Sequence, residues 1–96
     1  MNIGKIKRGD IYSLKLDGAD PVLIIQSNIG RNQMLTAVPV LYGNKKMRVL
    51  PTHVSLPKVS GLESDSFILS EQIRIIDYSV LSGYIGKISS QVLKDL

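Results

Sequence analysis

The basic cluster Lys45, Lys46 and Arg48 is the group of side chains best suited to binding a polyanion in this chain of 96 residues. The cluster follows Tyr42 in a polar segment that is expected to form a loop between two strands. Positive charge beside an aromatic ring combines the two contacts that proteins make with single-stranded nucleic acids, namely phosphate neutralisation and base stacking. The pattern therefore predicts a nucleic-acid-binding surface at these residues.

His53 is the chain's single histidine and a candidate general base, because an unperturbed imidazole has a pKa of about 6.5. It lies in an alternating segment, 52–56, which is typical of a half-buried strand, so one face of the ring is expected to pack against neighbours. A binding or structural role therefore competes with a catalytic one. One histidine and no cysteine leave too few soft ligands for a transition-metal site, and we expect neither a metal nor a cofactor.

Length and composition predict one domain, covering residues 1–96. The net charge is +4, and the absence of cysteine suits a reducing cytoplasm. No apolar run approaches the roughly 20 residues that a membrane span needs, and the N-terminus is polar, unlike a signal peptide. We therefore expect a cytoplasmic protein that does not contact a membrane.

Short strands punctuated by glycine and proline dominate the predicted secondary structure. A single helical turn is expected at 70–73, and a short C-terminal helix is expected after Ser89 or Ser90. Pro39 suggests that the third strand lies at an edge or contains a bulge. The apolar run 21–26 is typical of a strand covered on both faces. The fold class is mostly β, a closed or half-closed barrel with short helices, and its strands are expected at 10–16, 21–26, 35–41, 52–56, 67–69, 74–76 and 84–88.

Three segments, in this order and at these separations, resemble the MazF/PemK/Kid family of bacterial toxin endoribonucleases. They are Arg-Gly-Asp-Ile-Tyr at 8–12, Leu-Pro-Thr-His-Val at 50–54 and Glu-Gln-Ile-Arg-Ile-Ile-Asp at 71–77. The resemblance extends over about residues 7–88 and implies a small SH3-like barrel that forms a symmetric homodimer. It also implies metal-independent cleavage of single-stranded RNA by its own 2′-hydroxyl, and an acidic cognate antitoxin whose tail covers the RNA-binding face.

The resemblance implies positions for catalytic residues, and one of them departs from the family pattern. The family carries an arginine before the proline of its second strand, where it is thought to stabilise charge on the phosphate, whereas this chain has Asp20. The family's catalytic serine or threonine falls at Tyr42, or at Gly43 if the alignment slips by one residue. Glu71 matches an acidic residue in one branch of the family and is a candidate base. The loop at 17–20 is also shorter than in the family.

Three hypotheses follow from this mixture of agreement and departure, of which the third is a purely structural or regulatory interaction domain. The first is an endoribonuclease toxin whose candidate catalytic residues are Tyr42 and Glu71, with RNA contacts from His53 and from the basic cluster. The second is a catalytically inactive module on the same barrel that keeps binding to RNA, DNA or the antitoxin. Arg74 can contact phosphate in either case, but its apolar segment favours an ion pair with Asp77 or Glu71.

Overall fold

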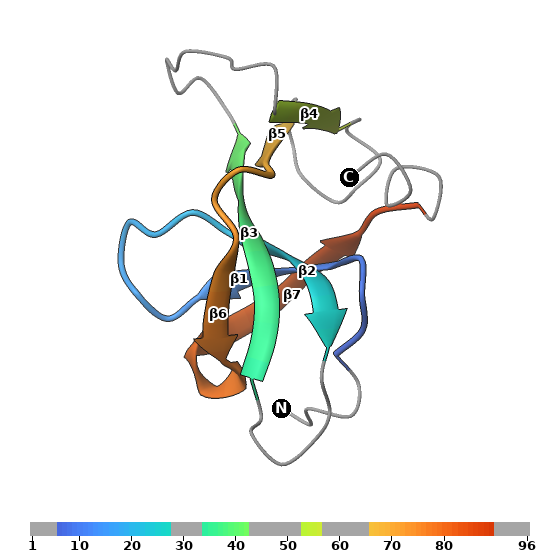
Figure 1. Ribbon diagram of the computed structural model, residues 1–96. Helices are drawn as coiled ribbons and strands as arrows, with labels where there is room; N and C mark the ends of the chain where they lie inside the picture. The colour runs from blue at the N-terminus through green and yellow to red at the C-terminus, as the bar shows by residue number, and fades with distance from the viewer. Residues whose placement is uncertain (1–5, 28–33, 43–52, 57–65, 90–96) are drawn as a thin grey trace.

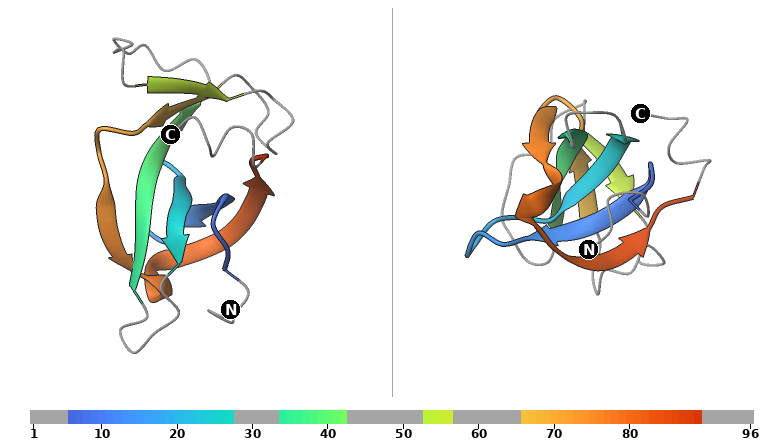
Figure 2. Two further views of the ribbon diagram at one scale, coloured as in Figure 1. Left: turned by 45° about the vertical axis from the view of Figure 1, so that its right-hand side comes forward. Right: turned by 90° about the horizontal axis from the view of Figure 1, so that it is seen from below.

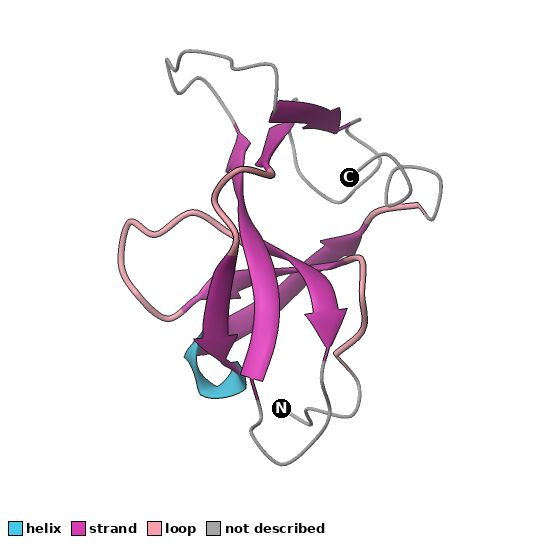
Figure 3. Cartoon of the chain, viewed as in Figure 1, coloured by secondary structure: helices cyan, strands magenta, loops and turns pink. Residues whose placement is uncertain are grey.

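The computed structural model of the protein describes residues 6–27, 34–42, 53–56 and 66–89 (Figure 1). These residues form short strands and a single 3-10 turn (Figure 3), which confirms the mostly β class. The elements are β1 (Asp10–Leu14), β2 (Val22–Ser27), β3 (Met34–Tyr42), β4 (His53–Leu56), β5 (Ser66–Leu69), β6 (Arg74–Asp77), the 3-10 turn η3 (Tyr78–Val80) and β7 (Leu81–Lys87).

The strands form an antiparallel sheet in the order β4-β5-β3-β2-β1-β7, and β6 also pairs with β3. The long strand β3 organises this arrangement because β2 pairs along one of its sides, whereas β6 and β5 share the other side. β6 pairs with the first half of β3, up to Ala37, and β5 pairs with the second half, from Val40. Viewed from below, the strands curl around a central core (Figure 2). The described strands thus make a half-closed barrel.

Pro39 lies inside β3, and the prediction that this strand is at an edge was wrong. β3 has partners on both sides, and the register irregularity in its pairing with β2 lies between Ile24 and Gln26 rather than at the proline. The Val40 nitrogen donates to the Pro21 carbonyl in the direction of β2, so the nitrogen of Pro39 faces the opposite side. On that opposite side, β6 pairs with β3 only up to Ala37 and β5 pairs with it only from Val40, so Pro39 has no partner strand. A residue without an N–H group therefore costs the sheet no hydrogen bond.

The core has two parts, one on each face of the sheet. Leu23 of β2 belongs to one cluster, together with Val38, Val40 and Ile68. Its neighbours Val22 and Ile24 belong to the other cluster, which also contains Tyr12, Leu35 and Leu81. The side chains of these three β2 residues are at most 1% exposed. This confirms the prediction that the apolar run forms a strand covered on both faces.

The short helices were predicted less well than the strands. At 70–73 the chain makes a turn, in which the Gln72 nitrogen donates to the Leu69 carbonyl over 2.9 Å, instead of the predicted helical turn. The helical turn occurs instead at η3, where the Asp77 carboxylate accepts a hydrogen bond from the Ser79 nitrogen. The predicted C-terminal helix lies outside the described residues.

Candidate functional site

The start of β2 places Asp20 beside the C-terminal end of β3. Pro21 is buried, and its carbonyl accepts a 2.8 Å hydrogen bond from the Val40 nitrogen. Asp20, one residue earlier, is half-buried. The loop before it is tight because the Ala19 nitrogen donates to the Leu16 carbonyl over 3.1 Å and Gly18 has a φ of 76°. Glycine adopts this left-handed conformation without the steric cost of a Cβ atom. Position 20 is therefore fixed by strand pairing on one side and by a short turn on the other.

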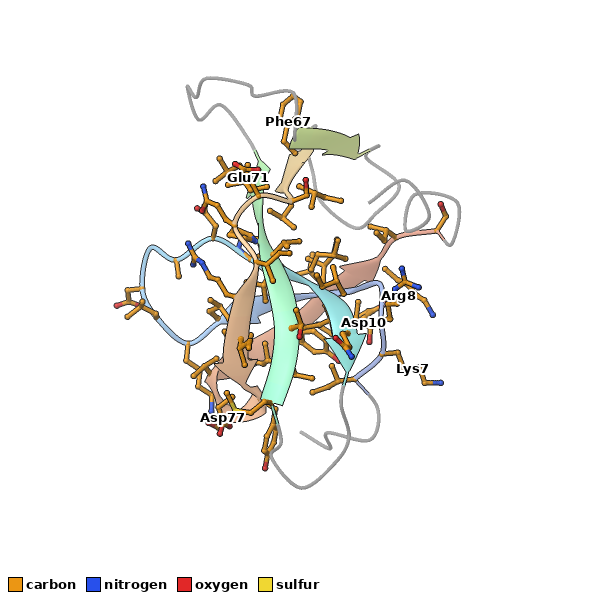
Figure 4. The ribbon with its side chains drawn as sticks, viewed as in Figure 1. Lys7, Arg8, Asp10, Phe67, Glu71 and Asp77 are labelled. Atoms are coloured by element: carbon orange, nitrogen blue, oxygen red, sulfur yellow. The ribbon has the colours of Figure 1, made fainter. Side chains whose placement is uncertain are left out.

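Of the two candidate catalytic residues, Tyr42 ends β3 and Glu71 lies in a turn beside the middle of that strand. Tyr42 is the last residue of β3, where its backbone pairs with Ser66 of β5. Glu71 is exposed and lies in the turn that follows β5 (Figure 4). The turn that carries Glu71 therefore faces the stretch of β3 between Ala37 and Val40, on the side opposite β2. The side chain of Tyr42 is outside the described part.

The predicted RNA-binding residues are only partly covered by the structure. Lys45, Lys46 and Arg48 lie outside the described residues. His53 is the first residue of β4 and pairs with Leu69 of β5, which agrees with the predicted strand, but its side chain is not described.

Arg74 contacts a neighbour that the sequence did not suggest. Its Nη2 atom donates to the Gln72 side-chain oxygen over 3.4 Å, and the guanidinium is exposed. Asp77 instead accepts hydrogen bonds from the Ser79 backbone nitrogen and hydroxyl group, which lower the pKa of the carboxyl group. Asp77 thus serves as the cap of η3, and the side-chain partner that the structure shows for Arg74 is Gln72.

A tight turn before β1 holds Arg8 at the surface. Asp10 is only 6% exposed, and its Oδ2 atom accepts a 2.9 Å hydrogen bond from the Lys7 nitrogen. The Asp10 nitrogen donates back to the Lys7 carbonyl over 3.0 Å. Gly9, with a φ of 97°, donates to Ile24 and accepts from Ile88, which ties the turn to β2 and to the residue after β7.

An apolar cleft opens next to this turn. Its volume is about 250 Å³, and its described lining residues are Arg8, Ile25, Val38, Ser70 and Ile73. They come from four separate segments, because Ser70 and Ile73 share the turn between β5 and β6, so the cleft exists only once the sheet has formed. The sequence signal that could have indicated it is Ile73, a large apolar residue beside polar neighbours in a predicted turn.

Two aromatic rings form a separate feature at the pairing of β1 with β7. Tyr12 is buried and Tyr84 is 59% exposed, and their rings meet edge to face with centroids 5.6 Å apart. Burial raises the pKa of Tyr12, and electrostatic interactions with Asp10 and with Tyr84 raise it further.

The described residues lack two other kinds of feature. No group of three or more histidine, cysteine, aspartate or glutamate side chains in these ranges is placed to hold a metal ion. No helix within the same ranges is long and apolar enough to cross a membrane.

Comparison with known proteins identifies the family to which this chain belongs. A family model described as PemK-like, MazF-like toxin of type II toxin-antitoxin system matches residues 7–96. The chain belongs to this family. Among curated PemK/MazF relatives, endoribonuclease EndoA of Bacillus subtilis is 38% identical over 98 residues, which cover 92% of this chain and 84% of that protein. Endoribonuclease MazF of Staphylococcus saprophyticus is 33% identical over 101 residues, which cover 95% and 84% of the two chains.

Solved structures of PemK/MazF-like proteins share the fold. An endoribonuclease in complex with its cognate antitoxin from a mycobacterial species superposes with a TM-score of 0.74 at 23% identity, covering 93% of this chain and 84% of that one. Mycobacterium tuberculosis toxin MazF-mt6 gives a TM-score of 0.71 at 26% identity, covering 90% and 89% of the two chains. These similarities confirm the small SH3-like barrel that the sequence predicted.

Proposed function

We propose that this protein is the toxin of a type II toxin–antitoxin pair, that it acts on single-stranded RNA in the cytoplasm as a homodimer, and that its cleavage activity is weak. The observation that carries the proposal is the family match over residues 7–96. The relatives named endoribonucleases support it because each aligns over 84% of its own length. The complex of a structural neighbour with its cognate antitoxin supports an antitoxin as the protein partner.

Cleavage of RNA by its own 2′-hydroxyl requires three groups. A base removes the hydroxyl proton, an acid protonates the leaving 5′-oxygen, and a cation or hydrogen-bond donor stabilises the charge that develops on the phosphorus oxygens. Glu71 is the proposed base because its carboxylate is exposed beside β3. Tyr42 supplies a hydroxyl at the strand end. Lys45, Lys46, Arg48 and His53 remain the proposed RNA-binding residues.

The third group, a cation or donor that stabilises charge on the phosphorus oxygens, is absent from position 20, where the family carries an arginine. Arginine suits a phosphate because its planar fork donates two parallel hydrogen bonds, whereas the carboxylate of Asp20 repels the same phosphate. A single donor to an oxyanion is worth roughly 10²–10³ in rate. The pairing of Pro21 with Val40 leaves the backbone of Asp20 little freedom to move away. Weak cleavage is therefore the expected behaviour of the natural sequence.

The test measures cleavage of a long single-stranded RNA, in the presence of a chelator, by the natural protein and by substitutions at Asp20. Asp20→Arg should raise the cleavage rate by at least about tenfold, and by more than Asp20→Asn does, because it restores a phosphate donor rather than only removing a negative charge. The matched control is Asp17→Arg, which makes the same change of charge in the same short loop at an exposed position. It should leave the rate nearly unchanged.

Two results would contradict this reasoning about Asp20. One is strong metal-independent cleavage by the natural protein that Asp20→Ala leaves untouched. The other is an equal gain from Asp17→Arg, which would show that only net charge matters.

A second candidate function is an inactive module that binds RNA, DNA or antitoxin, and Asp20 together with the short loop at 17–20 favours it. Its signature is salt-dependent RNA binding without cleavage by the natural protein or by Asp20→Arg.

A further inference from the structure

The edge strand β7 presents an exposed aromatic ring. In the sheet order β7 lies at one end, and among the described strands it pairs only with β1. Tyr84, near its middle, is 59% exposed, although its ring meets that of the buried Tyr12 edge to face at an interplanar angle of 74°. Tyr12 covers at most one face of the Tyr84 ring, and the contact restricts how that ring moves. Tyr84 therefore presents an aromatic face to solvent in a restricted orientation.

A β-bulge places Lys87 on the same face of the sheet as Tyr84. Tyr84 pairs with Tyr12 and Lys87 pairs with Asp10, and the register shifts between these two pairs. Because Asp10 and Tyr12 are two residues apart on β1, they share a face, and the residues opposite them share it too. Ile85, the extra residue of β7, packs against the core cluster on the other face. Without this bulge, residues three apart such as Tyr84 and Lys87 would point to opposite faces.

Positive charge is concentrated on the β1–β7 edge, which comprises residues 6–16 and 81–89. These residues include one acidic side chain, that of Asp10, which is 6% exposed, and four exposed cations, namely Lys7, Arg8, Lys15 and Lys87. The exposed acidic side chains of the described part lie elsewhere, at positions 17, 71 and 77. Lys7 extends outward from the turn before β1 (Figure 4), and its nitrogen donates to the Asp10 carboxylate over 2.9 Å. Lys7 and Lys87 therefore both border Asp10 at one end of this edge.

We propose that the β1–β7 edge is a second contact surface for single-stranded RNA, on which a base stacks against Tyr84 and neighbouring phosphates contact Lys87 and Lys7. The inference rests on the proposed function, because the strand bound here is a flank of the same RNA substrate. An acidic protein segment would engage the lysines alone, whereas every nucleobase can stack on an exposed ring beside cations. The surface is separate from the candidate site at β3, because β2 and β1 lie between β3 and β7 in the sheet.

The experiment measures binding of the full-length protein to a labelled 2′-O-methyl RNA of about 16 nucleotides by fluorescence anisotropy at several salt concentrations. This strand has no free 2′-hydroxyl, so binding is measured without cleavage. Tyr84→Ala should weaken binding by about tenfold through loss of base stacking, whereas Tyr84→Phe keeps the ring and should bind as the natural protein does. Lys87→Gln should weaken binding and lower the slope of log affinity against log salt by about 0.7, as expected for one phosphate contact on a single strand.

Matched controls come from the opposite end of the same edge. Lys15→Gln removes an exposed charge from a residue whose nitrogen donates to the Val80 carbonyl over 2.9 Å, away from Lys87. Leu16→Ala truncates a large apolar side chain that is 73% exposed, as Tyr84→Ala does, but it removes no aromatic ring. Both control variants should leave the affinity for the oligonucleotide and its salt slope nearly unchanged.

Three results would overturn the inference while leaving the proposed function intact. The first is unchanged affinity of Tyr84→Ala for the oligonucleotide. The second is an equal loss in Lys15→Gln and Lys87→Gln, which would show that only net charge matters. The third is a change of oligomeric state of Tyr84→Ala in sedimentation, which would assign the ring to a contact between copies of the chain. Absence of both RNA cleavage and RNA binding in the natural protein would instead refute the proposed function, and the inference with it.

Discussion

Replacement of the buried Asp10 should destabilise the protein more than the small size of this side chain suggests. The side chain is 6% exposed and accepts a 2.9 Å hydrogen bond from the Lys7 nitrogen, while the Asp10 nitrogen donates to the Lys7 carbonyl over 3.0 Å. Asp10→Ala removes the acceptor and leaves the Lys7 N–H group without its partner in a part-buried site. The same turn ties the start of β1 to Gly9 and, through Gly9, to β2.

The expected magnitude follows from this geometry. Hydrogen bonds to charged groups contribute about 1.5–3 kcal/mol, and an unsatisfied buried donor costs about 1–3 kcal/mol. These two figures describe one lost interaction and are not summed. The exposure of part of the turn favours the lower half of the range, so Asp10→Ala should lower the free energy of unfolding by about 2 kcal/mol. For a domain of this length that corresponds to a fall in Tm of about 8–16 °C.

The assay is urea unfolding followed by circular dichroism, at pH 7 and at one protein concentration, because the proposed dimerisation would make the apparent stability concentration-dependent. Asp10→Asn keeps an acceptor oxygen and should lose about half as much as Asp10→Ala. Asp17→Ala removes an exposed carboxylate from the loop before β2 and should change the free energy of unfolding by less than about 0.5 kcal/mol. An Asp10→Ala protein as stable as Asp17→Ala would refute the idea that this carboxylate holds the turn.

Two further predictions concern pH. The pKa of Tyr12 is raised, so its neutral phenol stabilises the folded state fully below the usual pKa of 10.0, and this stability is lost as the pH rises through the raised value. The natural protein should therefore lose stability relative to Tyr12→Phe in urea unfolding at alkaline pH. Unfolding free energies of the two proteins that fall in parallel with pH would contradict this prediction. The lowered pKa of Asp77 means that its carboxylate stabilises the folded state above its usual pKa of 3.8 and that this stability is lost as the pH falls through the lowered value. The difference in stability between the natural protein and Asp77→Ala should therefore become smaller in acid. A constant difference in unfolding midpoint down to pH 2 would show that ionisation of Asp77 does not cause the difference.

The strands could be predicted from the sequence wherever burial imposes a pattern on it. The run at 21–26 is apolar without interruption because both faces of β2 are covered, and the strands β4, β5 and β6 begin or end within one residue of the predicted bounds. The start of β7 was placed at Tyr84 instead of Leu81, because Ser82 and Gly83 resemble a turn. The structure explains their presence, since the Gly83 nitrogen donates to the Ser13 hydroxyl over 3.0 Å at an irregular point of the pairing with β1.

The turn between β5 and β6 shows why local patterns fail at connections. Residues 70–73 have polar and apolar side chains at a spacing that permits a helical turn. In the fold, however, β5 and β6 pair in succession with the same side of β3 (Figure 1), so this segment joins two extended strands across a gap in one ladder. A four-residue helix has no cooperative stability of its own, and strand pairing on either side determines its conformation.

The candidate site was predictable in its residue types but not in its geometry. The sequence drew attention to Asp20, Tyr42 and Glu71 through family resemblance. The structure puts the backbones of Asp20 and Tyr42 at the C-terminal end of β3, whereas the turn that carries Glu71 lies beside the middle of that strand. The cleft beside Arg8 could not be predicted, because its lining residues come from four segments whose proximity depends on the register of β2, β3 and β6. Register is a long-range property that no local window of sequence contains.

The position of Arg74 makes this residue a poor substitute for a cation at position 20. Arg74 pairs with Ala37, whereas Pro21 bonds to Val40 on the other side of β3. Three residues along a strand correspond to about 10 Å, so the backbones of Arg74 and Asp20 are separated along β3 as well as across it. The Arg74 guanidinium is also engaged with Gln72. Transition-state stabilisation depends on donors held within a few tenths of an ångström of their place, and strand pairing gives that precision at position 20, which is why Asp20→Arg is the substitution expected to restore activity.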